Sequence, residues 1–530
     1  MSKRFQAGQA KGGARTAGSA DAAIRNSLRV AACAIALAAG ASVATPAFAQ
    51  TAAVAQGPMI GAVTAKSAKV WVRLDAPATV RVRYKTPKAV DYTYSDVATV
   101  DADGDFTARF TLAGLAAGKT YSYQVGITTD DVETWSGSYT FSSLRGTVTS
   151  LSFAVMADFA NKLQGSEALR TALAARPEFL AVIGDLDHRS PAADENHVIH
   201  PPEDAPLVLD DLRAMHRDTR DFATEIGNDF ASGLIGFADS GVKQIPLYYA
   251  WDDHDFCVNN ADDTCPFAAQ AVQSYREYYL WSDDNGIDGT NGCPIASDFQ
   301  SVRYGRVATV FMLDARSARD EAADTLLGDC QYNWLKRGLA NAKTTWKIIL
   351  SPGPFNPSAK TWDGWGEFPG ERSRLLSFIQ RKAIRNVVFI SADMHTGGAV
   401  DDGTHSGAPE VSVPHANMPE NWINTFCKLF DQGNYAQSEP GLWTMGSLVE
   451  PDFGNTPATC GGNEIPPETT LVWPDVGVYP LSGLDTPGYV SVDATATTLT
   501  ATVHAPDGSV RDGVLADGSA TPMQLTLTAN

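Results

Sequence analysis

Three carboxylates and an imidazole lie side by side in the stretch YYAWDDHDF, residues 248–256. Asp252, Asp253, His254 and Asp255 come directly after an apolar run that is typical of a buried strand. Clustered carboxylates repel one another unless a cation or a proton lies among them. The stretch therefore raises the question of which positive charge neutralises these acids.

Four other apolar runs also end in polar residues that can bind a metal or a substrate. The residues placed in this way are Asp158, Asp185 with His188, Asp314 with Arg316, and Asp393 with His395. Sites in open α/β sheets form at the carboxyl ends of the strands. One such strand end means little, because Asp is common in turns and at helix N-caps. Five of them, composed mostly of Asp and His, indicate one shared site.

Two of these strand ends have spacings that suit metal ligands. Asp393 and His395 are two residues apart, so both side chains point to one face if the strand continues through them. Asp185 and His188 flank a turn that could fold both side chains onto one ion. Oxygen and imidazole ligands without thiolate suit Mn, Fe, Zn or Ca. Two adjacent cations, about 3.5–4 Å apart, would need several carboxylates, at least one of them bridging.

A pair of cations of this kind favours one type of chemistry. It holds a hydroxide between the metals at neutral pH and clamps a phosphoryl oxygen for in-line attack. His254, next to a metal-binding Asp, would then donate a hydrogen bond to the phosphoryl group or protonate the leaving oxygen. Asp252 and Asp255 could orient His254.

The chain around these residues shows two different patterns of apolar and polar positions. Residues 58–145 alternate apolar and polar positions between turn signals, which predicts a small antiparallel β-sandwich with a fibronectin-like pattern, placed at residues 50–147. From Leu151 short apolar runs alternate with helical stretches, which indicates a layered α/β domain over residues 148–482. Residues 483–530 return to strands and are expected to complete that domain. Residues 401–482 are rich in Pro, Gly and Asn, and long loops are expected there.

The first 49 residues are expected to be a cleaved signal peptide. A basic region precedes the apolar stretch VAACAIALAAG, and an A-x-A site ends at Ala49. No later run is long and apolar enough for a transmembrane helix. A periplasmic or secreted protein is therefore predicted.

Charge and cysteine content narrow the partners and the compartment. The formal net charge of −20 argues against nucleic acid or an anionic membrane as the main partner. A small anionic substrate would need local positive charge from metal ions or arginines. Six cysteines follow the predicted signal peptide, and an even number in an oxidising compartment suggests disulfides, with Cys257–Cys265 as the favoured pair.

Six sequence blocks of the chain together resemble the signature of a known family. The blocks FAVMADF, IGDLDHR, WDDHDFCVNNAD, VFMLDARSARD, WDGWGEFPGER and VVFISADMHTGG resemble, in this order, the signature of the alkaline phosphatase D (PhoD-like) family of calcineurin-like metallophosphoesterases. The resemblance runs from about residue 58 to the C-terminus. It implies a four-layer α/β/β/α sandwich, a binuclear metal centre and hydrolysis of phosphate esters outside the cytoplasm, with iron and calcium as reported metals.

The resemblance also assigns roles to positions of this sequence. Asp158 falls at the first ligand, Asp185 at the bridging carboxylate and Asp253 at a position that the superfamily usually fills with Asn. The set of metal ligands then comprises Asp158, Asp185, His188, Asp253, Asp393 and His395, with His254 as the catalytic residue.

Two departures from the family pattern leave the metal open among Fe, Ca, Zn and Mn. His188 stands where the family has an iron-binding tyrosine, and Asp158 where it often has cysteine. The stretch ILSPGP also lacks a histidine that many superfamily members carry after that strand.

Substrate-binding residues are less clearly marked. Asn260 and Arg316 are candidates, with a turn residue and a buried salt bridge to Asp314 or Asp320 as the alternatives. Trp362 and Trp365 could line a rim loop that selects the leaving group, or could simply pack.

Three functions remain open from the sequence. The first is an exported metal-dependent phosphatase or phosphodiesterase, and the second is its phospholipase-type variant. The third is a non-catalytic secreted protein whose acids bind structural calcium. His254 favours catalysis, since a calcium site has little use for an imidazole. The natural ester and the oligomeric state are not predicted.

Overall fold

The computed structural model describes residues 51–159, 167–188, 205–221, 244–289, 293, 296–360, 363–395, 397–417, 435–439, 442–445, 470–472, 477–480, 487–515 and 517–530. Residues 50–530 form one compact unit, and the predicted signal peptide lies outside the described residues. In the described part of the chain, no helix has both the length and the apolar character needed to cross a membrane. The predicted boundaries near residues 147 and 482 stay predictions.

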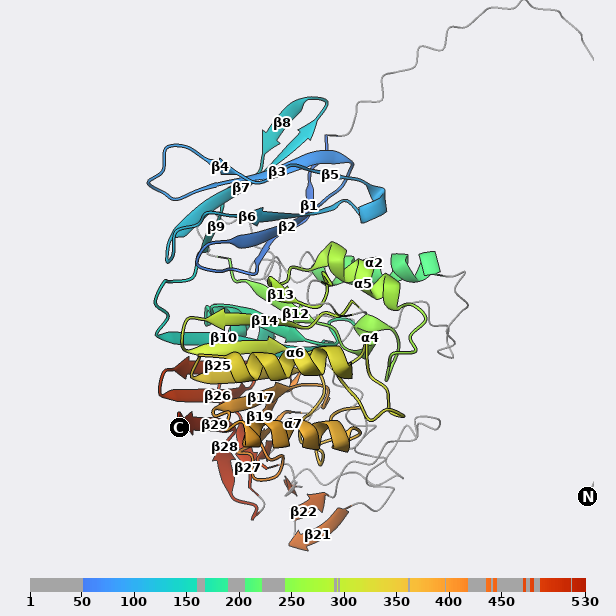
Figure 1. The fold of residues 1–530 in the computed structure, drawn as a ribbon, viewed down its shortest axis with the longest axis vertical. Helices are drawn as coiled ribbons and strands as arrows, with labels where there is room; N and C mark the ends of the chain where they lie inside the picture. Colours follow the sequence, from blue (N-terminus) through green and yellow to red (C-terminus); the bar gives the residue numbers. More distant parts are fainter. Residues whose placement is uncertain are drawn as a thin grey trace, which may run out of the picture. The chain divides into compact units, whose positions relative to one another are not determined.

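Two large sheets form the centre of this unit (Figure 1). The first contains, in spatial order, β12 (Leu247–Ala250), β11 (Leu180–Ile183), β10 (Ser150–Phe159), β25 (Tyr489–Thr495), β26 (Thr498–His504) and β29 (Gln524–Thr528), with β20 (His415–Asn417) also paired to β10. The second contains β13 (Asp284–Asn285), β14 (Gln300–Tyr304), β15 (Ala308–Met312), β16 (Trp346–Ser351), β17 (Val387–Ser391), β19 (Glu410–Ser412) and β18 (Ala399–Asp401).

The two sheets pack face to face because alternate side chains of each strand point to opposite sides. In β10, Phe153 and Val155 point into the core between the sheets, whereas Met156 points to the helices outside. In β15, Val310 lies in the same inter-sheet core and Phe311 faces the outer helices of the second sheet.

Helices cover the two outer faces (Figure 1). The first sheet is covered by α1 (Glu167–Ala174), α2 (Ala205–Asp221) and α5 (Ala268–Tyr278), and the second by α6 (Gly328–Asn341) and α7 (Pro369–Arg381). The four-layer α/β/β/α sandwich expected from the resemblance is thereby confirmed.

Parallel pairing brings the carboxyl ends of the central strands to one edge. β10, β11 and β12 are mutually parallel in the first sheet, as are β15, β16, β17 and β19 in the second. β25 runs antiparallel to β10 over six residue pairs, so the C-terminal strands are part of the first sheet.

The N-terminal part is a β-sandwich, as predicted. β1 (Val54–Gly61), β2 (Ala68–Leu74) and β6 (Thr107–Leu112) form one sheet. The other contains β3 (Ala78–Lys85), β4 (Thr93–Tyr94), β5 (Ala98–Val100), β7 (Thr120–Thr129), β8 (Val132–Trp135) and β9 (Tyr139–Ser142). One hydrophobic core lies between them, and a short 3-10 helix, η1 (Ala102–Gly104), connects β5 to β6.

The expectation of long loops over residues 401–482 is wrong in part. β19 pairs with β17 of the second sheet, and β20, three residues later, pairs with β10 of the first. The further short strands are β21 (Tyr435–Glu439), β22 (Leu442–Met445), β23 (Thr470–Val472) and β24 (Tyr479–Pro480), with β27 (Asp512–Val514) and β28 (Ala520–Pro522) near the C-terminus. Most of these strands have two or three residues, too few for an alternation that a sequence pattern could detect.

The disulfide prediction is confirmed for the pair that was named. Cys257 and Cys265 are bonded, and a second disulfide joins Cys293 to Cys330. Cys427 and Cys460 lie outside the described residues.

A truncation tests whether the C-terminal strands are needed for the fold. A chain ending at residue 486 lacks β25, β26 and β29, so β10 loses its antiparallel neighbour and the inter-sheet core loses Val490, Val492 and Leu499. We expect this chain to be insoluble or to unfold without a cooperative transition, measured by circular dichroism on heating. A chain of residues 50–530 is the control, and cooperative unfolding of both at similar temperatures would contradict the expectation.

Candidate metal centre

Residues from four strand ends meet at the carboxyl edge of the two sheets. Asp158 lies at the end of β10, and Asp185 and His188 follow β11. Asp253 and His254 open α4 (Asp253–Phe256), a single helical turn directly after β12. Asp393 and His395 follow β17 of the second sheet.

These side chains form three overlapping groups of three ligand atoms. Within each group all atoms lie within 4.8 Å of one another, and the groups are Asp185 with His188 and His395, Asp158 with Asp393 and His395, and Asp185 with Asp253 and His254. All six predicted ligands and His254 are thus brought together. Their roles as ligands stay a proposal, since the distances alone identify no ion.

The backbone is strained at the residues that converge. Asp158, Asp185, Asp393 and His395 have φ values of 54°, 48°, 55° and 51°. Non-glycine residues rarely adopt positive φ, and such strain collects at functional sites, where the surrounding structure enforces it. β17 ends at Ser391 and does not continue through Asp393 and His395, so the left-handed turns, and not a shared strand face, bring both side chains to the cluster.

Gly184 allows two of the segments to approach each other. It precedes Asp185 at φ 104°, and a Cβ at this position would lie 2.5 Å from the Cβ of Asp252. Only glycine fits both the conformation and the contact. The motif IGD therefore places Asp185 against the start of α4.

Buried ligand atoms without hydrogen bonds show that the residues fit a metal. Among the described residues, Asp158 Oδ2, both Asp185 oxygens, His188 Nε2 and His395 Nε2 are buried and have no hydrogen-bond partner. His188 Nε2 and Asp185 Oδ2 lie 2.8 Å apart, but they are not aligned as a hydrogen bond. Buried polar atoms normally find partners, so an unpaired set at one place is suited to hold cations.

Burial changes the proton affinity of these groups. Burial first, and then the nearby Asp252, raise the pKa of Asp158 to about 8. Burial and the neighbouring carboxylates also hold the pKa of Asp185 well above its usual value. Burial lowers the pKa of His188, His254 and His395, which leaves the imidazoles neutral, as metal ligation requires.

Asp253 behaves differently from the other acids. Burial alone would raise its pKa, but the charge of Arg316 and the backbone N–H of Asn260 hold it below its usual value. The Asn260 N–H donates to Asp253 Oδ2 at 2.5 Å. Asp253 therefore stays charged in the absence of a metal.

The two predicted substrate-binding residues have structural partners. Asn260 has a φ of 57°, which agrees with its alternative as a turn residue. Arg316 is 1% exposed and pairs with Asp252 and Asp363, so its salt bridge joins acids other than the expected Asp314 and Asp320. Asp314 instead accepts the backbone N–H of Arg316 at 2.8 Å. Contact of Asn260 or Arg316 with a substrate stays a prediction.

Several residues of the site were not found by sequence reasoning. Lys360 donates to Asp393 and, at 3.1 Å, to Asp363, and Arg319 lies 2.9 Å from Asp363. Asp363 lies in the block WDGWGEFPGER, in which the sequence alone marks only the tryptophans as candidate site residues. No periodicity or spacing marks these residues, because their partners come from distant segments.

Asp252 and Asp255 connect the loops of the site through an ion pair and hydrogen bonds. Asp252 pairs with Arg316 as described above. Asp255 accepts the backbone N–H of Leu186 at 3.1 Å and that of Asp252 at 3.2 Å. It thereby joins the turn that carries Asp185 to the turn that carries Asp253.

Of the two tryptophans considered for a rim loop, only Trp365 lies among the described residues. Trp365 is fully buried, stacks edge-on against Phe355 and donates to Ser351, so it packs in the core. Trp362 lies outside the described residues.

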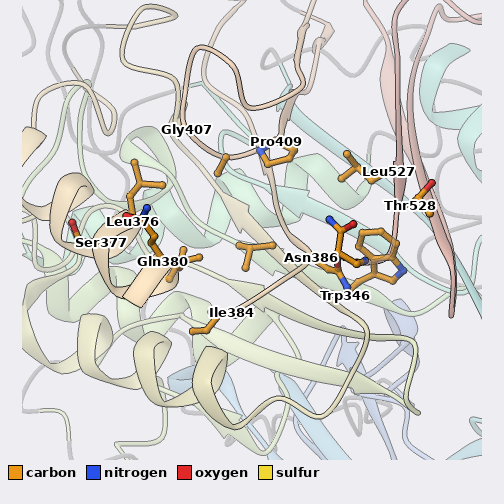
Figure 2. A pocket seen from close by; sticks show the side chains of 14 residues that line it. Trp346, Leu376, Ser377, Gln380, Ile384, Asn386, Gly407, Pro409, Leu527 and Thr528 are labelled. Atoms are coloured by element: carbon orange, nitrogen blue, oxygen red, sulfur yellow. Dashed lines mark hydrogen bonds between the residues drawn. The ribbon is translucent and has the colours of Figure 1, made fainter. Parts of the chain in front are cut away.

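A groove lies at the opposite ends of the strands. It has a volume of about 510 Å³ and lies between the end of α7 and β29, with Trp346 and Val387 at the amino ends of β16 and β17 in its wall (Figure 2). None of the predicted site residues lines it.

Two family models match parts of the chain. The model described as PhoD-like phosphatase matches residues 239–413, and a domain of unknown function, DUF7800, matches residues 51–142. Alkaline phosphatase D of Bacillus subtilis (strain 168) is 27% identical over 186 residues, which cover 29% of this chain. The chain spans 32% of that relative's length in this match.

Two solved structures share the fold. The structure of PhoD aligns with a TM-score of 0.58 at 15% identity and covers 89% of this chain and 90% of that one. The purple acid phosphatase PPD1 from yellow lupin (Lupinus luteus) aligns with a TM-score of 0.51 at 13% identity, covering 89% and 74%.

Replacing Asp255 tests the junction of the two ligand-bearing turns. We expect Asp255→Ala to weaken binding of a divalent ion about 10–100-fold, because residues that orient ligands contribute on this scale. Isothermal titration with Mn²⁺ measures it. Asp507→Ala, which changes an exposed turn after β26, is the control. Equal affinities of both variants would contradict the role of Asp255.

The pH dependence of the metal-free protein tests the electrostatics. Asp158 and Asp185 hold protons in the folded state that they lose in the unfolded chain, so stability falls as pH rises toward about 8. The histidines, with lowered pKa, have the opposite effect, which ends near pH 6.5, the usual histidine value.

We therefore expect the unfolding midpoint in chelator to drop between about pH 6.5 and pH 8. Differential scanning fluorimetry measures it, and Asp158→Asn, which has no proton to lose, should flatten the drop. A midpoint that is constant or rises over this range would contradict the assignment.

Proposed function

The chain belongs to the PhoD-like family, and we propose that its cluster of buried carboxylates and imidazoles hydrolyses phosphate esters with the help of divalent cations. One observation carries the proposal. Buried atoms of Asp158, Asp185, His188 and His395 converge without hydrogen-bond partners among the described residues. Two cations would satisfy these atoms. Asp185 and His395 each belong to two of the three ligand groups, and Asp185, which has two unpaired carboxylate oxygens, could serve both cations.

The residues present can supply each part that such a reaction needs. When bound, the cations would provide Lewis acidity and lower the pKa of a water molecule, which is the chemistry that hydrolysis of a phosphate ester needs. Asp253, held in the charged form, and the neutral imidazoles of His188 and His395 are suited to hold them. Iron, calcium, zinc and manganese all remain candidates.

His254 is proposed as the residue that contacts the substrate. It follows Asp253 in α4, is 8% exposed, and its ring centroid lies 4.0 Å from that of His188. Because its pKa is lowered by burial, it is neutral at pH 7 and offers an N–H to the phosphoryl group. A hydrogen bond that strengthens as charge develops on the phosphoryl oxygens accelerates the reaction.

Arg316 is proposed to stabilise the acids of the site by its charge. Its guanidinium pairs with Asp252 and Asp363 and lies 3.9 Å from Asp253 and 3.7 Å from Asp393. Its positive charge offsets the repulsion among the acids and orients two of the proposed ligands. Direct contact with a phosphate oxygen would require it to leave these partners.

The calcium-binding alternative is less well supported. Calcium is bound by oxygen ligands, whereas His188, His254 and His395 all belong to the ligand groups here. The two disulfides support export to an oxidising compartment, which we include in the proposal.

The proposal is tested with the mature chain, residues 50–530, after removal of metals. We expect turnover of nitrophenyl phosphate or bis-nitrophenyl phosphate to be absent in chelator and to return with Mn, Fe, Zn or Ca. The ratio of the two rates shows whether monoesters or diesters are preferred. If no metal restores turnover of either ester, the calcium-binding alternative stands.

Two variants separate metal binding from catalysis. We expect Asp253→Ala to lose both the metal and activity, because Asp253 is a proposed ligand. We expect His254→Ala to keep the metal and to lose about 10²–10³-fold in rate, the scale of one transition-state hydrogen bond. Metal content is measured by mass spectrometry on both variants, and equal metal loss would defeat the assigned roles.

A further inference from the structure

Lys360 is a buried ammonium group within the acid cluster. It lies in the segment between β16 and α7 and is 9% exposed. Its Nζ donates to Asp393 Oδ2 and, at 3.1 Å, to Asp363 Oδ2. A buried lysine that faces two carboxylates forms ion pairs with them, in addition to packing against its neighbours.

The contact divides the two oxygens of Asp393 between different partners. Oδ2 accepts from Lys360 and also lies 3.7 Å from Arg316. Oδ1 lies 3.5 Å from Nε2 of His395, on the side of the proposed ligand group. Only Oδ1 is therefore directed toward the metal while Lys360 stays in place.

Lys360 is also the last cation in a chain of alternating charges. The chain runs from Asp252 through Arg316, Asp363 and Lys360 to Asp393, and all five are buried. It links the start of α4, which carries Asp253 and His254, to the turn after β17. The positions of proposed ligands on both sheets are thus connected without any ion.

We propose that Lys360 is a positioning residue, a built-in counter-ion that holds Asp393 when the metal is absent and withholds its Oδ2 from coordination. The inference rests on the proposed metal centre. Removing one partner of a buried pair leaves an uncompensated charge, so Lys360 stabilises the metal-free fold. The same ammonium repels a nearby divalent ion, so it weakens metal binding. These two effects have opposite signs and can be measured separately.

The test replaces Lys360 by methionine, which retains the length of the side chain and removes the charge. In chelator we expect Lys360→Met to unfold at a lower temperature than the wild type. With saturating Mn²⁺, Zn²⁺ or Ca²⁺, each tried alone, we expect the difference to shrink or vanish. Titration calorimetry should show tighter binding of the ion that stabilises the wild type, on the order of tenfold or more.

Lys347→Met is the matched control. Lys347 is also 9% exposed, but it donates to the backbone carbonyls of Thr344, Thr345 and Arg385 at the amino end of β16. Its loss should lower stability equally with and without metal and leave metal affinity unchanged. Lys360→Arg, which keeps the charge, should resemble the wild type in both measurements.

Three results would overturn the inference. The first is equal loss of stability by Lys360→Met in chelator and in metal, as in the control, and the second is unchanged or weaker metal binding. If Lys360→Met does not fold, Lys360→Gln takes its place. The third result is that neither variant folds even with metal, because the loss of stability would then not depend on the ion. A wild type that no metal stabilises would instead contradict the proposed metal centre.

Discussion

Mutual repulsion among buried carboxylates is the constraint on which the rest of the structure depends. Asp158, Asp185, Asp253 and Asp393 are each 4% exposed or less and lie in one cluster. Charges buried at such distances destabilise a fold unless they are paired, protonated or bound to a cation. The protein uses all three means: ion pairs to Arg316 and Lys360, raised pKa values, and ligand atoms left free for a metal.

Both sheets contribute residues to this cluster. The first sheet supplies Asp158, Asp185 and the start of α4, and the second supplies Asp393 and His395. Two of the three ligand groups combine residues of both sheets, whereas Asp185, Asp253 and His254 all follow strands of the first sheet. The packing of the inter-sheet core therefore sets the distances within the two mixed groups. The C-terminal strands have the same importance, since β25 pairs along β10 and fixes the strand that carries Asp158.

The acids of the site fall into two kinds that differ in their partners. Asp252, Asp255 and Asp363 accept from guanidinium groups, an ammonium or backbone N–H groups and hold the loops together. Asp158 and Asp185 keep buried oxygens without hydrogen bonds among the described residues. The first kind makes the second tolerable, because a rigid shell of paired charges prevents the unpaired oxygens from moving apart or toward solvent.

The sequence by itself determined the longer strands, their helices, the Cys257–Cys265 bond and the proposed ligands that meet at the cluster, because alternating apolar positions, polar strand ends and closely spaced cysteines are local signals. Only the tertiary structure decided which acids are free for a metal and which are paired. Arg316 lies 64 residues from Asp252, and Lys360 lies 33 residues from Asp393. In the sequence all these aspartates look alike, and their roles differ because charge pairing acts through space between segments that the fold brings together.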